Sequence, residues 1–195
     1  MGLKELLHEL SDTANQLNCL KTGEFILSSG ATSSYYFDGR ILTLNPKGAS
    51  LIGSIVLELF TDLQIDAVAG PAVAAVPIIS AVVVLSSLSS QNLSGIIMRA
   101  QPKTHGTKQS LEGDVVSGMK VVVVDDTCTT GGSLLSTIDA LQQAGCTVVS
   151  CVCVLDRKEG GSSALEKRGV SLVSLLEIDQ ASKKIKPSSI ALGTR

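Results

Sequence analysis

The chain has 195 residues, enough for one domain with a substantial core, and 44% of them are hydrophobic, which excludes a disordered protein. A net charge of −2 offers no electrostatic surface to a nucleic acid, so no nucleic-acid partner is expected. Five cysteines without a C-x-x-C pair, and only two histidines, argue against a disulfide framework and a structural zinc site. With no signal peptide, this cysteine usage favours a reducing cytoplasm.

The first forty residues fall outside the regular alternation of strands and helices that follows. Leucines at helical spacing predict an amphipathic helix over residues 3–18. Short strand-like pieces at 25–27 and 35–37 flank a Ser/Gly-rich loop. We therefore expect residues 1–40 to contribute a small N-terminal hood lobe over the main sheet of a single domain that spans residues 1–195.

Residues 67–98 carry no charge, which is long enough to raise the possibility of a membrane span. Two prolines and a Ser-rich stretch break this run, so a buried strand, a helix and a second strand explain it better. The expected elements of this part are a helix from Pro46 to about 60 with Asn45 as N-cap, a strand at 66–69, a helix at 75–85 and a strand at 96–98. No membrane partner is expected.

Strands and helices continue to alternate in the second half of the chain. Cys151 and Cys153 alternate with valines, so both are expected on one face of a strand. The expected elements are a polar loop at 99–113, strands at 121–124, 147–155 and 170–176, and helices at 133–144 and 162–168; nothing is predicted beyond residue 179. This order predicts an α/β fold with a Rossmann-like parallel sheet and right-handed crossovers.

The most informative stretch begins with Val121–Val124, four residues typical of a strand that is buried on both faces. Two carboxylates follow where that strand emerges, and a hydroxyl- and glycine-rich turn then leads into a helix. Such a turn is a natural phosphate site, and the acidic pair suits sugar hydroxyls or a hydrated metal ion. The residues of this candidate site are Asp125, Asp126, Thr127, Cys128, Thr129, Thr130, Gly131, Gly132 and Ser133. Taken separately, these features would also fit ordinary helix capping.

A second cluster lies in the polar loop, where Arg99, Lys103, His105 and Lys108 gather. Cations on a loop beside a phosphate turn can close over a diphosphate and neutralise the charge that grows on a leaving group. The alternative is solvated surface charge. Cys128 as a nucleophile is a weaker hypothesis, because no histidine is near it in the sequence.

Read as one string, residues 121–133 resemble the phosphoribosyl-pyrophosphate (PRPP) signature of type I phosphoribosyltransferases; no Walker sequence G-x-x-x-x-G-K-[ST] occurs. From about residue 20 to 170 the chain resembles orotate phosphoribosyltransferases in particular. The segments that carry this resemblance are Phe25-Ile-Leu-Ser-Ser-Gly30, Tyr35-Tyr36-Phe37-Asp38-Gly39-Arg40, Arg99-x-x-x-Lys103-x-His105-Gly106, Glu112-Gly113, the PRPP turn and Leu155-Asp156-Arg157.

The resemblance implies a type I phosphoribosyltransferase core that converts orotate and PRPP to orotidine 5′-monophosphate and pyrophosphate with Mg²⁺, in pyrimidine synthesis. It implies that Asp125 and Asp126 hold the ribose hydroxyls and the metal's water shell, with Asp125 the candidate metal ligand. Residues 127–133 would bind PRPP, those at 129–133 would cradle its 5′-phosphate, and Arg99, Lys103 and His105 would bind its diphosphate. Tyr36, Phe37, Thr129 and Arg157 would contact orotate. It also implies a homodimer with shared active sites.

The chain departs from the family pattern at three positions. Ala100 stands where many members have a second basic residue, and Ser28 and Ala74 stand where lysines occur in some members. Because a charge-assisted hydrogen bond is worth about 1.5–3 kcal/mol, we expect weaker PRPP binding, with Lys108 as the candidate to compensate. Two other functions stay open: a non-catalytic PRPP-binding regulator, and a phosphoribosyltransferase for another base.

Overall fold

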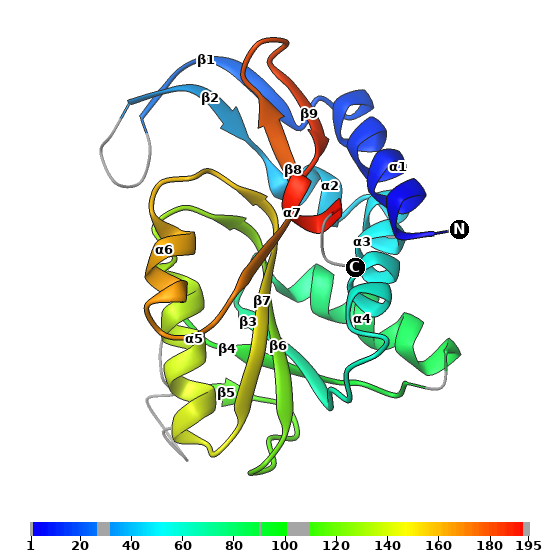
Figure 1. The fold of residues 1–195 in the computed structure, drawn as a ribbon, viewed down its shortest axis with the longest axis vertical. Helices are drawn as coiled ribbons and strands as arrows, with labels where there is room; N and C mark the ends of the chain where they lie inside the picture. The colour runs from blue at the N-terminus through cyan, green and yellow to red at the C-terminus, as the bar shows by residue number, and fades with distance from the viewer. Residues whose placement is uncertain (1, 27–31, 90, 101–109, 193–195) are drawn as a thin grey trace.

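A seven-stranded sheet forms the centre of the computed structural model, which describes residues 2–26, 32–89, 91–100 and 110–192. The strand order is β5-β4-β3-β6-β7-β8-β9 (Figure 1). The bounds are β3 Ala67–Pro71, β4 Ser94–Met98, β5 Leu111–Glu112, β6 Lys120–Cys128, β7 Thr147–Asp156, β8 Leu172–Asp179 and β9 Lys184–Pro187. The five inner strands run parallel, as predicted, whereas the edge strands β5 and β9 run antiparallel to their neighbours.

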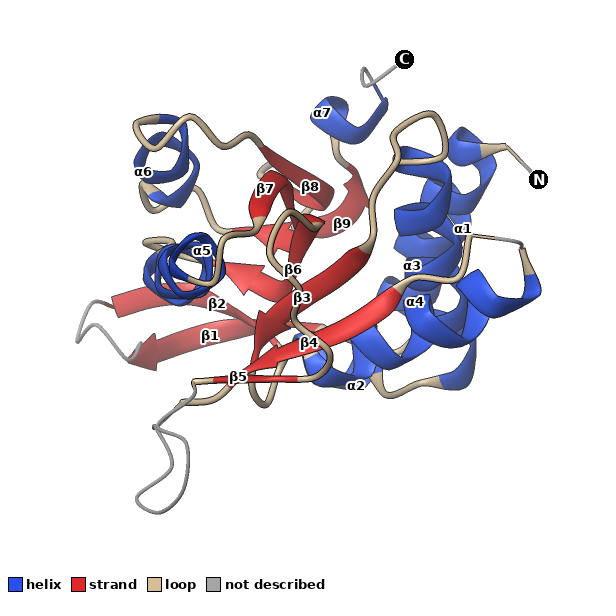
Figure 2. Ribbon diagram, turned by 90° about the horizontal axis from the view of Figure 1, so that it is seen from below, coloured by secondary structure: helices blue, strands red, loops and turns tan. Residues whose placement is uncertain are grey.

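Helices cover both faces of this sheet, so the domain has three layers (Figure 2). Helices α1 (Leu3–Gln16), α3 (Pro46–Leu59) and α4 (Val76–Leu88) lie on one face, and α5 (Gly132–Gln143) and α6 (Gly161–Glu166) on the other. Asn45 is the N-cap of α3, as predicted, because its side chain accepts hydrogen bonds from the backbone N–H groups of Lys47 and Gly48.

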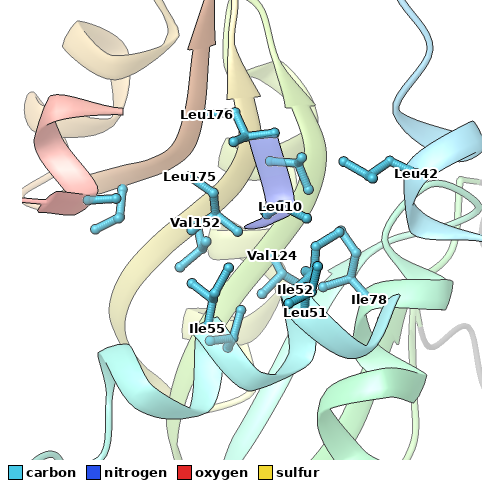
Figure 3. Close-up of a cluster of buried hydrophobic side chains, with 14 of the residues drawn as sticks. Leu10, Leu42, Leu51, Ile52, Ile55, Ile78, Val124, Val152, Leu175 and Leu176 are labelled. Atoms are coloured by element: carbon cyan, nitrogen blue, oxygen red, sulfur yellow. The ribbon is translucent and has the colours of Figure 1, made fainter. Parts of the chain in front are cut away.

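The four valines of β6 explain why this strand is central. Val122 and Val124 point into the core beneath α1, α3 and α4, and Val121 and Val123 point into the core beneath α5; all four are fully buried. Figure 3 shows Val124 within the first of these cores. Cys151 and Cys153 of β7 both belong to the second core, which confirms that they share one face of the strand.

The uncharged run 67–98 forms β3, α4 and β4, which confirms the division predicted from its prolines and serines. Within the described residues, no helix combines the length and the apolar character that a membrane crossing needs.

Residues 1–40 pack in two different places of the structure. Helix α1 packs against α3 and β9, and so belongs to the main body. The antiparallel hairpin of β1 (Leu20–Ile26) and β2 (Thr32–Phe37) instead lies beyond the carboxyl ends of the central strands, followed by the short helix α2 (Gly39–Thr43) (Figure 1). The hairpin and α2 are therefore the part of this region that reaches the candidate site.

Candidate active site

The strand that leads into the site is longer than expected. Strand β6 continues through Asp125 and Asp126 to Cys128, and stays paired with β7 as far as the Cys128–Asp156 position. The turn at 129–131 therefore lies at the carboxyl end of the sheet, where α/β proteins bind ligands. Gly131 has φ 81°, a left-handed conformation that favours glycine, and α5 begins at the next residue. The backbone N–H groups that open α5 point into this region, which suits a phosphate.

Asp125 is held from two sides. Its Oδ1 accepts the backbone N–H of Asp126 at 2.9 Å, and its Oδ2 accepts the hydroxyl of Ser133 at 3.0 Å. Only 4% of the residue is exposed. Burial raises the pKa of this carboxyl to about 7, with repulsion by Asp126 as the second cause, while the two hydrogen bonds oppose the shift.

Asp126 faces the segment that follows the hairpin. Burial also raises its pKa, while a hydrogen bond from Thr127 and the positive charge of Arg40 act in the opposite direction. Gly39 packs directly on this carboxylate: a Cβ at Gly39 would lie 2.9 Å from Asp126 Oδ2 and 3.0 Å from Asp126 Cβ. The absence of a side chain at Gly39 thus lets α2 close against the acidic pair, a relationship that the sequence did not reveal.

The turn at 129–131, called the phosphate turn below, also packs against the start of α6. Gly161 donates its backbone N–H to the carbonyl of Thr129 at 2.9 Å, and a Cβ there would overlap Cys128 Sγ. Cys128 is 1% exposed, and burial raises the pKa of its thiol to about 12, with repulsion by Asp156 as the second cause. A buried thiol that stays protonated is a poor nucleophile, so its role is packing beneath the turn.

Arg157 emerges at the end of β7 and meets the hairpin. Its side chain is 7% exposed, and its Nε lies 2.9 Å from Glu159 Oε1. One terminal nitrogen, Nη2, donates to Ser33 Oγ at 3.2 Å, and the guanidinium carbon lies 5.3 Å from the centre of the Tyr35 ring. The sequence indicates Arg157 as a site residue but not Ser33, Tyr35 or Glu159. Nothing in the strand-like piece predicted at 35–37, or in the Ser/Gly-rich loop before it, says which residue meets β7.

The two aromatic residues expected at the base lie in different surroundings. Tyr36 is half-buried, and its ring centre lies 5.7 Å from that of Phe25 on the neighbouring strand. Phe37 is 5% exposed and belongs to the core beneath α1, α3 and α4. Thr129 is half-buried in the phosphate turn, and Thr130 and Ser133 are exposed at its surface.

The cationic loop is only partly within the described residues. Arg99 forms an ion pair with Glu112, its Nη1 lying 2.8 Å from Oε1, beside a cavity of about 580 Å³ that Ala72, Val76, Ile97 and Ala100 also line. Ala74 lies in the adjacent turn between β3 and α4. The predicted contributions of Lys103, His105 and Lys108, and the departure at Ser28, lie outside the described residues.

The acidic pair fits one kind of metal ion. Among the described residues, no three His, Cys, Asp or Glu side chains are grouped to hold a metal. Mg²⁺, however, commonly binds through one or two carboxylates, several waters and the oxygens of a phosphorylated substrate. Asp125 and Asp126, adjacent and beside the phosphate turn, fit that requirement.

Comparison with known proteins agrees with this geometry. Residues 40–182 match the phosphoribosyl transferase domain family. The orotate phosphoribosyltransferase of Rhodopirellula baltica is 38% identical over 169 residues, which cover 84% of this chain and 88% of that protein. The Pyrococcus furiosus orotate phosphoribosyltransferase is 40% identical over 83% of this chain and 87% of its own. The Mycobacterium tuberculosis H37Rv enzyme, in its crystal structure with PRPP, superposes with a TM-score of 0.72 at 31% identity over 88% of this chain and 96% of that one.

A parallel sheet with an acidic pair and a Thr/Gly turn at its carboxyl edge defines a phosphoribosyltransferase of type I. Within that class, the chain belongs to the orotate phosphoribosyltransferase family.

Proposed function

We propose that this chain transfers the phosphoribosyl group of PRPP to orotate, giving orotidine 5′-monophosphate and pyrophosphate in the synthesis of UMP. The observation that carries this proposal is the continuous unit formed by β6, the acidic pair, the turn at 129–131 and the start of α5. Similarity to orotate phosphoribosyltransferases over more than four fifths of the chain supports orotate as the acceptor.

The proposed role of each residue follows from its position in the site. The turn and the first N–H groups of α5 would hold the 5′-phosphate, and Asp126, with Asp125 behind it, would hold the ribose hydroxyls. Positive charge develops on the sugar as the bond at its anomeric carbon breaks. The protein's task is then to position both substrates and to stabilise the leaving diphosphate, and no covalent nucleophile is needed.

Mg²⁺ is the proposed cofactor. The ion would be held chiefly by oxygens of PRPP and by water, near the acidic pair Asp125 and Asp126, and it would supply positive charge that offsets the diphosphate. Arg99, Lys103 and His105 are the residues proposed to bind the diphosphate itself.

The proposed partner is a second copy of this chain. Helix α4 exposes apolar side chains along its outer side and in the turn before it: Val73 is 76%, Val84 61% and Leu88 80% exposed. Water-exposed apolar residues grouped on one helix are typical of a subunit interface. In such a homodimer, the loop that carries Lys103 would serve the active site of the neighbouring subunit. The five cysteines are all buried and free of disulfides, which supports a reducing, cytoplasmic location.

An orotate assay tests the proposal. Purified protein with PRPP and Mg²⁺ should consume orotate, seen as loss of its absorbance, and Lys103→Ala should lower the turnover strongly. Turnover of another base alone would support a different phosphoribosyltransferase. PRPP binding without turnover of any base would support a regulator. Unchanged turnover in Lys103→Ala would remove that lysine from the mechanism. Because Ser28, Ala74 and Ala100 replace basic residues of some relatives, the Kd for PRPP should exceed that of a relative that has them.

A further inference from the structure

Arg157 is buried to an extent that is unusual for a charged side chain. With 7% of the side chain exposed, its guanidinium has lost most of its water and depends on protein groups for compensation. Three groups supply it: the Glu159 carboxylate at Nε, the Ser33 hydroxyl at Nη2, and the face of the Tyr35 ring. Two of the three come from β2, which is more than 120 positions away in the chain.

The hydroxyl of Ser33 has a defined direction. It donates its proton to the carbonyl of Tyr35 at 2.8 Å, so an oxygen lone pair is left to accept the N–H of Arg157. The same hydroxyl oxygen accepts the backbone N–H of Tyr35 at 3.3 Å. The local turn of β2 therefore fixes Ser33 as an acceptor that faces the guanidinium, with the Tyr35 ring beside it.

These contacts leave one terminal nitrogen of Arg157 available. Nη1 makes no hydrogen bond within the described residues, whereas Nε is buried beside the Glu159 carboxylate and cannot reach a ligand. A planar guanidinium that is held in a fixed orientation on one side can donate hydrogen bonds from its other side to oxygens along one edge of a planar ligand.

We propose that Ser33 and Tyr35 are positioning residues for Arg157, so that the β1–β2 hairpin sets the affinity for the base without contacting it through these two side chains. This assignment rests on the proposed function, in which Arg157 meets orotate. Its consequence is a division between the substrates: Ser33 and Tyr35 serve the base, whereas the turn after β6 serves PRPP.

Steady-state kinetics of single variants tests this. We expect Ser33→Ala to raise the KM for orotate about ten- to a hundredfold, the range for one charge-assisted hydrogen bond. Tyr35→Leu should raise it about three- to tenfold, the range for one cation–π contact, and the KM for PRPP should stay within twofold in both variants. Tyr35→Phe keeps the ring and should restore the KM for orotate to within twofold of the unmodified chain. Ser34→Ala, on the exposed neighbouring residue, is the matched control.

The outcomes separate the two proposals. If the unmodified chain does not turn orotate over, the proposed function is wrong and this assignment falls with it. If the chain is active but Ser33→Ala and Tyr35→Leu leave the KM for orotate unchanged, only the positioning role is overturned. Equal increases in both KM values, or a Tyr35→Phe variant as impaired as Tyr35→Leu, would also overturn it, because a general loosening of the fold would then explain the data.

Discussion

The hydroxyl of Ser133 donates a hydrogen bond to Asp125 Oδ2 at 3.0 Å, which ties the first turn of α5 to the end of β6. The other carboxylate oxygen accepts the N–H of Asp126, so Asp125 joins both sides of the phosphate turn. This bond is formed by a carboxyl group that burial makes reluctant to ionise. The turn is thus held by a group whose charge depends on pH near neutrality.

Asp125→Asn should change the pH dependence of stability. The folded pKa of Asp125 is about 7 against an ordinary 3.8, so the folded state binds this proton more tightly than the unfolded chain. Stability is then lost as pH rises from about 4 through 7. Asparagine cannot ionise, so the variant should match the parent at pH 4 and exceed its unfolding free energy at pH 8 by on the order of 2–4 kcal/mol.

Urea unfolding at several pH values measures this difference. Asp62→Asn, on an exposed residue, is the control for replacing a carboxylate by an amide. A constant difference between Asp125→Asn and the parent from pH 4 to pH 8 would show that burial does not perturb this carboxyl.

Gly39→Ala should impair PRPP use more than it impairs stability. A Cβ at this position would lie 2.9 Å from Asp126 Oδ2, so the carboxylate must move away from the place where we propose that it holds the ribose. Because small misplacements of a positioned group are costly, we expect kcat/KM for PRPP to fall about ten- to a hundredfold. The control is Gly2→Ala, where no atom lies within 4 Å of the added Cβ. Wild-type kcat/KM for PRPP in Gly39→Ala would mean that Asp126 adjusts without cost.

Gly161→Ala should loosen the phosphate turn from beneath. The added Cβ would overlap Cys128 Sγ and lie 2.7 Å from the carbonyl oxygen of Thr129. Overpacking of this kind costs about 1–3 kcal/mol of unfolding free energy, and the KM for PRPP should rise with it. Adding Cys128→Ala removes one of the two overlaps and should recover part of the loss. Ser162→Ala, on the exposed next residue, should unfold like the parent, and Gly161→Ala doing the same would argue against the close contact.

The alternation of apolar strands and amphipathic helices was sufficient to predict the parallel core, since the five inner strands carry strong local patterns. Strands β5 and β9 and helices α2 and α7 (Ser189–Leu192) were not predicted, and β5 lies within the stretch 99–113 that was expected to be a loop. Strand β9 has four residues, of which only Ile185 is buried. It therefore lacks the apolar alternation that marks a strand. It exists because the preceding strand β8 and the helix α1, which is distant in the chain, supply its partners.

The candidate site also has a part that the sequence predicts and a part that it does not. The phosphate turn was visible because its strand, acidic pair, glycines and helix are contiguous in the sequence. Gly39, Ser33 and Gly161 were not visible, because each acts through contacts with residues about 30 to 125 positions away. The proximity of Asp125 and Ser133 could be predicted from the sequence, since they are only eight positions apart. Only the structure shows that the Ser133 hydroxyl points toward the Asp125 carboxylate.

Asn15 explains how the edge strand β9 is held, and it gives a last prediction. Its Nδ2 donates to the carbonyl of Ile185 at 2.7 Å, and its Oδ1 accepts the Ile185 N–H at 3.1 Å, so one side chain replaces a strand partner. The same Nδ2 donates to the carbonyl of Ser11 at 2.9 Å.

Asn15→Ala should therefore cost about 1–3 kcal/mol of unfolding free energy, because it leaves these backbone groups without their partner. Asn15→Asp should cost more at pH 7, since a carboxylate oxygen would face the carbonyl oxygens of Ile185 and Ser11 where an N–H donor is required. Near pH 4, a protonated carboxyl can donate to one of them, so the Asp variant should recover part of the difference, which urea unfolding at both pH values would measure. Gln16→Ala, on the exposed neighbour, should match the parent at both pH values. Equal stability of the Ala and Asp variants at pH 7 would show that Asn15 does not act as the donor, and that β9 is held by β8 alone.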